Sequence, residues 1–232
     1  MSRAVLGWLG VLFIAAGGTG LWFAGKYAAA LSSAGSAVEI DTEYLRPPPA
    51  AGDKWLTEFT LTERSGKKFD SASLQGQVYV VSFFFSSCPS TCLQQNQKIR
   101  EIEREYGPKG VKFLSITCDP EVDSPQRLRE YADKLGADKT DWLFLTGDLP
   151  YTRRIAGEIY RISMDKREHS ERLFVVDKWG NQRGNYVWNQ LDRVTALKLE
   201  LDKLLAETVP PPQPAAEPAA SDGTEKPEAA AP

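Results

Sequence analysis

The feature that most constrains this sequence is an apolar run that leads directly into a pair of cysteines. Val78 to Phe85 is mostly apolar and predicts a buried strand. Cys88 and Cys92 follow, and we expect a helix from about Pro89 to Tyr106. Side chains four positions apart on a helix lie about 40° apart around its axis, so the two sulfurs can meet. Free backbone N–H groups at a helix start favour thiolate over thiol.

Two thiolates on one face suit a soft metal ion or a reversible disulfide, whereas a static disulfide or two buried thiols would carry no chemistry. Thioredoxin-type redox motifs have two residues between their cysteines, and this chain has three. The longer spacing still permits a disulfide and also leaves room for a metal ion between the sulfurs. Both interpretations stay open at this point.

Few other residues of the chain can complete a metal site. His169 is the only histidine, and it lies in the polar loop from Asp165 to Ser170. A neutral imidazole would complete a trigonal Cu(I) site with two thiolates, although a lone loop histidine is ordinarily a solvated side chain. Cys118 ends the next predicted strand, and we interpret it as a small buried hydrophobic residue.

Length and composition limit the number of domains and argue against a disulfide-stabilised scaffold and a nucleic-acid-binding protein. The chain has 232 residues, enough for one ordinary domain with appendages, and three cysteines, too few for a disulfide scaffold. Its formal net charge of −3 gives no indication of nucleic-acid binding.

The N-terminal region predicts a membrane anchor. Ala4 to Gly25 is uncharged and, at 22 residues, long enough to cross a bilayer as a helix. Arg3 precedes it, which favours a cytoplasmic N-terminus. A cleaved signal peptide is the alternative, although its apolar region is usually shorter. No Arg- and Ser-rich transit segment precedes the stretch, so we expect the bacterial inner membrane, with the soluble domain facing the periplasm.

The remaining chain divides by composition. We expect an anchor in residues 1–30, a linker in 31–54, a folded domain in 55–207 and a disordered Pro/Ala-rich tail in 208–232. Within the domain, apolar patterning predicts strands and helices that alternate and end in a hairpin and a helix. The predicted elements are a hairpin over 59–69, one helical turn at 71–74, strands at 78–85, 111–118 and 142–145, helices at 89–106, 125–134 and 151–159, strands at 171–176 and 181–187, and a helix at 191–205. This order is typical of an α/β, thioredoxin-like fold with a mixed central sheet flanked by helices.

Several motifs together resemble the Sco/SenC family of copper chaperones, over about Leu56 to Leu205. The family pattern places Cys-Pro-x-x-Cys after an aromatic strand, followed by Asp-Pro-Glu-x-Asp-Thr-Pro, a His-Ser pair and a strand that ends Val-Asp-x-x-Gly. The corresponding residues are Cys88–Cys92, Asp119–Pro125, His169–Ser170 and Val176–Gly180. The chain departs from the pattern at Leu93, where Pro is usual, at Ser124, where Thr is usual, and at Cys118, where an aliphatic residue is usual.

The resemblance implies that Cys88, Cys92 and His169 bind copper, as Cu(I), Cu(II) or both. It further implies delivery to the dinuclear copper centre of cytochrome c oxidase, or maintenance of that centre's cysteines in reduced form. The implied partners are the copper-bearing subunit of the oxidase and other copper chaperones or thiol reductases. The chain would then not be an enzyme in the turnover sense.

Two other functions fit the same residues. A thiol–disulfide oxidoreductase would use Cys88 and Cys92 as its redox-active pair and would not need His169. A redox sensor would bind a partner through the Pro-rich tail.

Overall fold

The computed structural model describes residues 56–168 and 170–211. A seven-stranded sheet forms the centre, in the order β2-β1-β5-β4-β3-β6-β7. The strands are β1 (Thr60–Glu63), β2 (Lys68–Asp70), β3 (Tyr79–Phe84), β4 (Lys112–Thr117), β5 (Trp142–Thr146), β6 (Arg172–Val176) and β7 (Gln182–Val187). The predicted mixed α/β architecture is therefore confirmed, whereas the predicted anchor, most of the linker and most of the tail lie outside the described residues. No helix in the described ranges is both long and apolar enough to cross a membrane.

The centre of the sheet is parallel and its two sides are antiparallel. β3 pairs with β4 and β4 with β5 in parallel, while β1 pairs with β5 and β6 pairs with β3 and β7 in antiparallel fashion. All six residues of β3 are buried, as expected for a central strand covered on both faces. Because β3, β4 and β5 run in the same direction, their C-terminal ends meet at one edge of the sheet.

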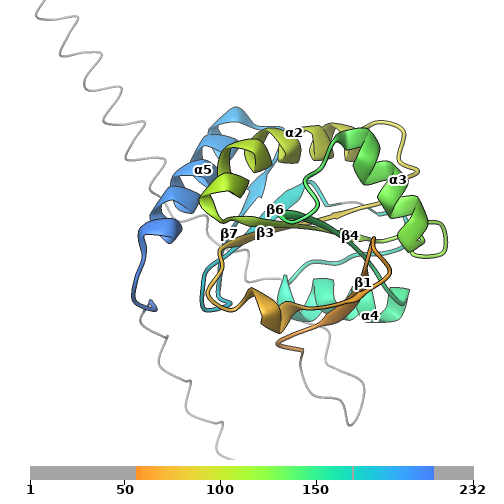
Figure 1. The fold of residues 1–232 in the computed structure, drawn as a ribbon, viewed down its shortest axis with the longest axis horizontal. Coiled ribbons are helices and arrows are strands. Elements are labelled where there is room, and N and C mark those ends of the chain that lie inside the picture. The colour runs from red at the N-terminus through yellow and green to blue at the C-terminus, as the bar shows by residue number, and fades with distance from the viewer. Residues whose placement is uncertain (1–55, 169, 212–232) are drawn as a thin grey trace, which may run out of the picture.

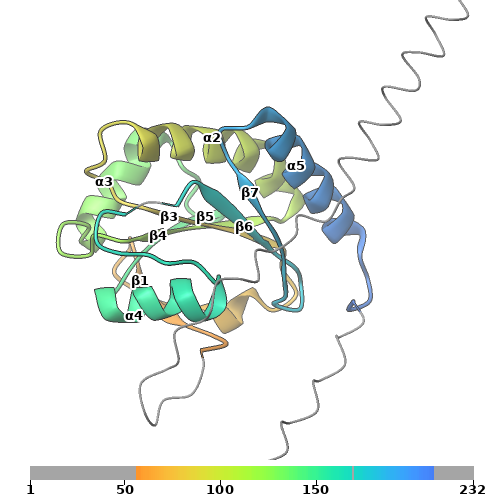
Figure 2. The same cartoon turned by 180° about the vertical axis from the view of Figure 1, so that it is seen from behind.

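Helices cover both faces of this sheet. Helices α2 (Thr91–Tyr106), α3 (Pro125–Leu135) and α5 (Leu191–Ala206) lie over one face, and α4 (Leu149–Arg154) lies on the other (Figures 1 and 2). Short 3-10 turns, η1 (Ser71–Leu74) and η2 (Gly107–Lys109), connect strands and helices. α3 begins as its sequence predicts, because the Ser124 side chain accepts a hydrogen bond from the Arg127 N–H and Pro125 occupies the first helical position.

The predicted helix over 151–159 differs from the observed one. The α-helical part begins earlier, at Leu149, and ends at Arg154, and Ile155–Ile159 continues as a π-helix, η3. The Tyr160 N–H reaches back to the Ile155 carbonyl, five residues away. Buried Glu158 of this segment accepts a hydrogen bond from the Leu56 N–H and pairs with Arg154. It therefore holds Leu56, which precedes β1, against η3. An apolar period of 3.6 residues cannot report such a local change of pitch.

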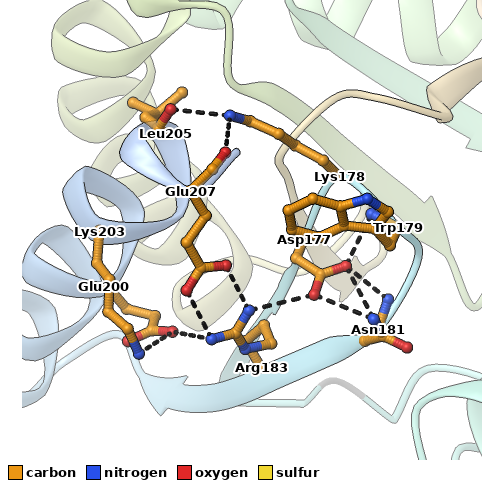
Figure 3. A network of polar contacts seen from close by, with 9 residues as sticks. All are labelled: Asp177, Lys178, Trp179, Asn181, Arg183, Glu200, Lys203, Leu205 and Glu207. Carbon is orange, nitrogen blue, oxygen red and sulfur yellow. Dashed lines mark hydrogen bonds and ion pairs between the residues drawn. The ribbon is translucent and has the colours of Figure 1, made fainter. Parts of the chain in front are cut away.

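A charged network closes the domain at the end of α5 (Figure 3). Arg183 on β7 pairs with fully buried Asp177 and with Glu207, and Lys178 donates to the carbonyls of Leu205 and Glu207. Val176, which precedes Asp177, pairs with Tyr79 at the start of β3. The network therefore lies at the opposite end of β3 from the cysteines.

Candidate functional site

The central strands β3 and β4 bring two loops together: residues 85–90, which we call the cysteine loop, and residues 118–124. The N–H of Cys118, the residue after β4, donates to the carbonyl of Phe84, the last residue of β3, at 2.8 Å, which continues the β3–β4 ladder to the ends of these strands. Residues 85–90 then lead from β3 to α2, and residues 118–124 lead from β4 to α3. Cys88 and Cys92 therefore lie at the edge where the parallel strands end, as predicted.

The helix begins later than predicted, and this corrects the position of Cys88. α2 starts at Thr91, so Cys88 lies in the loop and only Cys92 lies on the helix. Ser90 has φ −137° and ψ −71° and does not continue the helix toward Cys88. The N-cap residue, Ser90, makes no side-chain cap bond, and the Cys88 sulfur instead accepts a hydrogen bond from the first-turn N–H of Cys92 at 3.3 Å.

The two thiols nevertheless meet, as predicted, and their pKa values are shifted in opposite directions. Partial burial acts to raise the pKa of Cys88, but hydrogen bonds from the backbone of Cys92, Ser90 and Thr91 and from the Cys92 thiol outweigh it and lower that pKa. Burial raises the pKa of Cys92, which has no exposed surface. The thiolate form is therefore favoured at Cys88 and disfavoured at Cys92 in the metal-free protein, which differs from the expectation of two thiolates. All three cysteines are free thiols.

Asp123 fixes the loop that carries Cys88. This carboxylate is fully buried and accepts hydrogen bonds from the Ser86 N–H at 2.9 Å, the Ser86 hydroxyl, and the Thr117 hydroxyl at 2.5 Å. Arg127 also donates to the Ser86 hydroxyl from α3. Asp123 therefore joins β4 to the residue two positions before Cys88. Sequence analysis had included it only as part of the family pattern.

Two buried amides on α2, which were not predicted from the sequence, also lie next to the site. Gln95 donates to the Ser170 carbonyl at 2.9 Å, and Asn96 donates to the Tyr131 hydroxyl at 3.1 Å. Burial raises the pKa of Tyr131 to about 12. The signal available in the sequence is that Gln95 and Asn96 occupy helix positions that point toward the core, where polar residues need partners.

His169, the predicted third ligand, lies outside the described residues, but its neighbours are placed. The Ser170 carbonyl is bonded to Gln95, one turn after Cys92. Arg167 donates its N–H to the Cys118 carbonyl at 3.4 Å and its side chain to buried Asp119 at 2.9 Å. The chain is thus attached to α2 on one side of residue 169 and to the end of β4 on the other.

Cys118 is a small buried residue, as its position at the end of a predicted strand indicated. It is fully buried, and its thiol donates to the Phe84 carbonyl at 3.3 Å. Burial raises its pKa to about 12, which keeps it protonated at neutral pH. Within residues 56–168 and 170–211, no cluster of three or more His, Cys, Asp or Glu side chains could hold a metal ion, so Cys118 does not form a three-thiol site with the other two.

Comparisons with known proteins agree with this geometry. A family model described as SCO1/SenC matches residues 48–200. The chain belongs to the SCO1/SenC family. Its relatives include an SCO1 protein homolog of Bacillus subtilis, 29% identical over 91 residues that cover 38% of this chain and 47% of the relative. The aligned region thus spans about half of that relative's length.

Solved structures of the family share the fold. Yeast Sco1 with copper bound is 24% identical, with a TM-score of 0.57 over 70% of this chain and 94% of the yeast chain. BsSco, described as a member of the Sco family of cytochrome c oxidase assembly proteins, is 20% identical, with a TM-score of 0.59 over 66% of this chain and 95% of its own. This chain therefore shares the fold of the solved SCO1/SenC structures. Its Cys88 and Cys92 are in contact where the parallel strands of the sheet end.

Proposed function

We propose that this SCO1/SenC protein is a membrane-anchored copper chaperone. It holds copper through Cys88, Cys92 and His169 and passes it to the dinuclear copper centre of cytochrome c oxidase, or keeps the cysteines of that centre reduced. The observation that carries the proposal is the contact between two free thiols at the start of α2, in a family whose solved structures include a copper-bound member.

The donor set fits copper as a cargo. Thiolates are soft ligands that select Cu(I). The pKa of Cys88 is lowered because backbone N–H groups converge on its sulfur, and the residue is half-buried, within reach of an incoming ion. Cys92 has a raised pKa, so its proton leaves only as the metal arrives, and copper binding becomes stronger as pH rises.

The attachments around residue 169 support His169 as the third ligand. Gln95 holds the carbonyl of Ser170 next to the helix that bears Cys92. Arg167 is held at Cys118 and Asp119, where β4 ends beside the cysteine loop. The chain on both sides of residue 169 is therefore bonded to elements that lie next to the cysteines.

Transfer proceeds by ligand exchange. Thiolates of the acceptor replace the chaperone's ligands one at a time, and half-buried Cys88 is the ligand they reach first. Oxidation of Cys88 and Cys92 to a disulfide transfers two electrons to an oxidant such as a partner disulfide, releases two protons and abolishes soft-metal binding. Copper loading is therefore coupled to redox state.

The proposal includes partners and a location. The acceptor is the copper-bearing oxidase subunit, and other copper chaperones or thiol reductases supply copper or electrons. The chain is held by one span in a bacterial inner membrane with its domain in the periplasm, because Ala4 to Gly25 is uncharged and follows Arg3.

A thiol–disulfide oxidoreductase is the second candidate, and one observation favours it. A nucleophilic thiol of lowered pKa beside a buried thiol of raised pKa is the arrangement of an attacking and a resolving cysteine.

Anaerobic copper titration of the reduced protein tests the leading proposal. We expect one tightly bound Cu(I) per chain. Reduced protein that binds no copper contradicts the proposal and leaves the oxidoreductase.

A further inference from the structure

Two stretches of sequence, one of which contains Cys88 and Cys92, carry no charged residue. No Asp, Glu, Lys or Arg occurs from Ser86 to Gln97, or from Gly184 to Leu191. The whole chain is 25% charged, so an ordinary solvent-facing stretch as long as Ser86–Gln97 would carry about three charges. The exposed members of the two stretches are Ser87, Pro89, Ser90, Leu93, Gln94, Gln97, Asn189, Gln190 and Leu191, which we call the uncharged face.

A groove joins the two halves of this face. It has a volume of about 380 Å³ and is lined by Thr91 and Gln94 of α2, by Trp188 and Asn189 of the loop after β7, and by Leu191, the first residue of α5. The charged residues in its lining, Lys98 and Glu171, have opposite signs. Thr91 directly precedes Cys92 on α2, so the groove shares with the thiol pair the first turn of this helix, although neither cysteine lines it.

Large apolar side chains are exposed on the two uncharged stretches and on the loop that contacts Ser86. Leu191 is 84% exposed at the groove and Leu93 is 39% exposed next to Cys92. Val122, in the loop that carries Asp123, is also 39% exposed. Exposed apolar groups that gather beside a functional site mark an interaction surface, whereas scattered ones need no explanation.

We propose that the uncharged face is the docking surface for the protein that accepts copper from Cys88 and Cys92. This inference rests on the proposed function and adds the surface through which that function is performed. Ligand exchange needs direct contact, so an acceptor whose thiolate reaches half-buried Cys88 must cover the residues beside it. The cores of protein–protein interfaces are depleted of charged residues, as this face is. Nucleic acids and anionic lipids would instead need clustered Lys and Arg.

The uncharged face also indicates what the contacting surface of the acceptor must look like. Its matching surface is uncharged, with an apolar side chain that enters the groove beside Leu191 and a thiolate that lies over Cys88. Because the uncharged face contributes no charge and the two charges in the groove lining have opposite signs, we expect the transfer rate to change less than about threefold between low and high salt.

The test measures Cu(I) transfer from the full chain in detergent. The acceptor is the apo soluble copper-binding domain of the cytochrome c oxidase subunit from the same organism. Leu191→Asp and Leu191→Lys both place a charge in the lining of the groove, at an exposed residue that is not one of the copper ligands, so we expect copper binding to be unchanged. Leu199→Asp and Leu199→Lys are the matched controls, since Leu199 is 53% exposed on the same helix and does not line the groove.

We expect both Leu191 variants to transfer copper about tenfold more slowly than wild type, and both Leu199 variants to stay within about twofold of it. Transfer to a small Cu(I) chelator should be the same for all five proteins, because a chelator needs no docking surface. Leu191 variants that transfer at the wild-type rate, or a steep salt dependence, overturn the docking surface while the chaperone proposal stands. Wild type that binds copper but transfers none to the acceptor overturns both.

Discussion

Replacement of Asp123 by Ala tests the account of how the cysteine loop is held. The carboxylate is fully buried and accepts three hydrogen bonds, from the Ser86 N–H, the Ser86 hydroxyl and the Thr117 hydroxyl. Hydrogen bonds to a charged group contribute about 1.5–3 kcal/mol each. Three of them are not additive, and water can enter the space that the side chain leaves, so we expect a loss of about 3–5 kcal/mol in the free energy of unfolding.

Urea unfolding of the reduced, metal-free protein measures this loss. Glu121→Ala is the control in the same loop; the Glu121 side chain is 71% exposed, so we expect a change within about 0.5 kcal/mol. Arg183→Ala is a second control, which removes the pairs to Asp177 and Glu207 at the other end of the domain (Figure 3) and should cost about 1–3 kcal/mol. Asp123→Ala should weaken Cu(I) binding, whereas Arg183→Ala should leave it unchanged. A loss below about 1 kcal/mol for Asp123→Ala would refute the reasoning.

Three further predictions concern reactivity, the tail and topology. In the reduced, metal-free protein, iodoacetamide should label Cys88 before Cys92 and Cys118, and at a lower pH than an ordinary thiol, because its lowered pKa leaves more thiolate at any given pH. Peptide mapping checks this, and earlier labelling of Cys118 would contradict the burial described. Truncation after Thr208 should leave the melting temperature and copper binding unchanged, since it keeps Glu207 and its pair with Arg183; a large fall in melting temperature would show that the tail docks. Protease added to spheroplasts should digest the domain from Trp55 onward, and protection of that domain would contradict the periplasmic location.

Sequence reasoning predicted the elements better than their contacts. Val78 to Phe85 and Val111 to Cys118 are long apolar runs, so the central strands were found to within one residue at each end. The start of α2 was misplaced by two residues, because the backbone at Ser90 is not encoded in any apolar period. The position of the β1–β2 hairpin beside β5 depends on long-range pairing that local patterns do not contain.

At the site, too, the local sequence predicted which residues meet but not the interactions that depend on the tertiary structure. The local pattern Cys-Pro-Ser-Thr-Cys was enough to predict that Cys88 and Cys92 meet at a strand–helix corner. It could not predict their opposite pKa shifts, which depend on burial and on which sulfur the N–H groups reach. The role of Asp123 was also out of reach, since it joins residues 37 positions apart in sequence.

The most direct test of the central claim is the copper content of four single variants, measured anaerobically for Cu(I) and Cu(II). Cys88→Ser and Cys92→Ser should abolish tight binding of both states, because a hydroxyl is a poor ligand for Cu(I). Cys118→Ser should change little, since that thiol is buried and bonded to Phe84. His169→Ala should keep part of the Cu(I), held by two thiolates, and lose most of the Cu(II), which prefers nitrogen ligands. Equal Cu(II) binding by wild type and His169→Ala would contradict the three-ligand site.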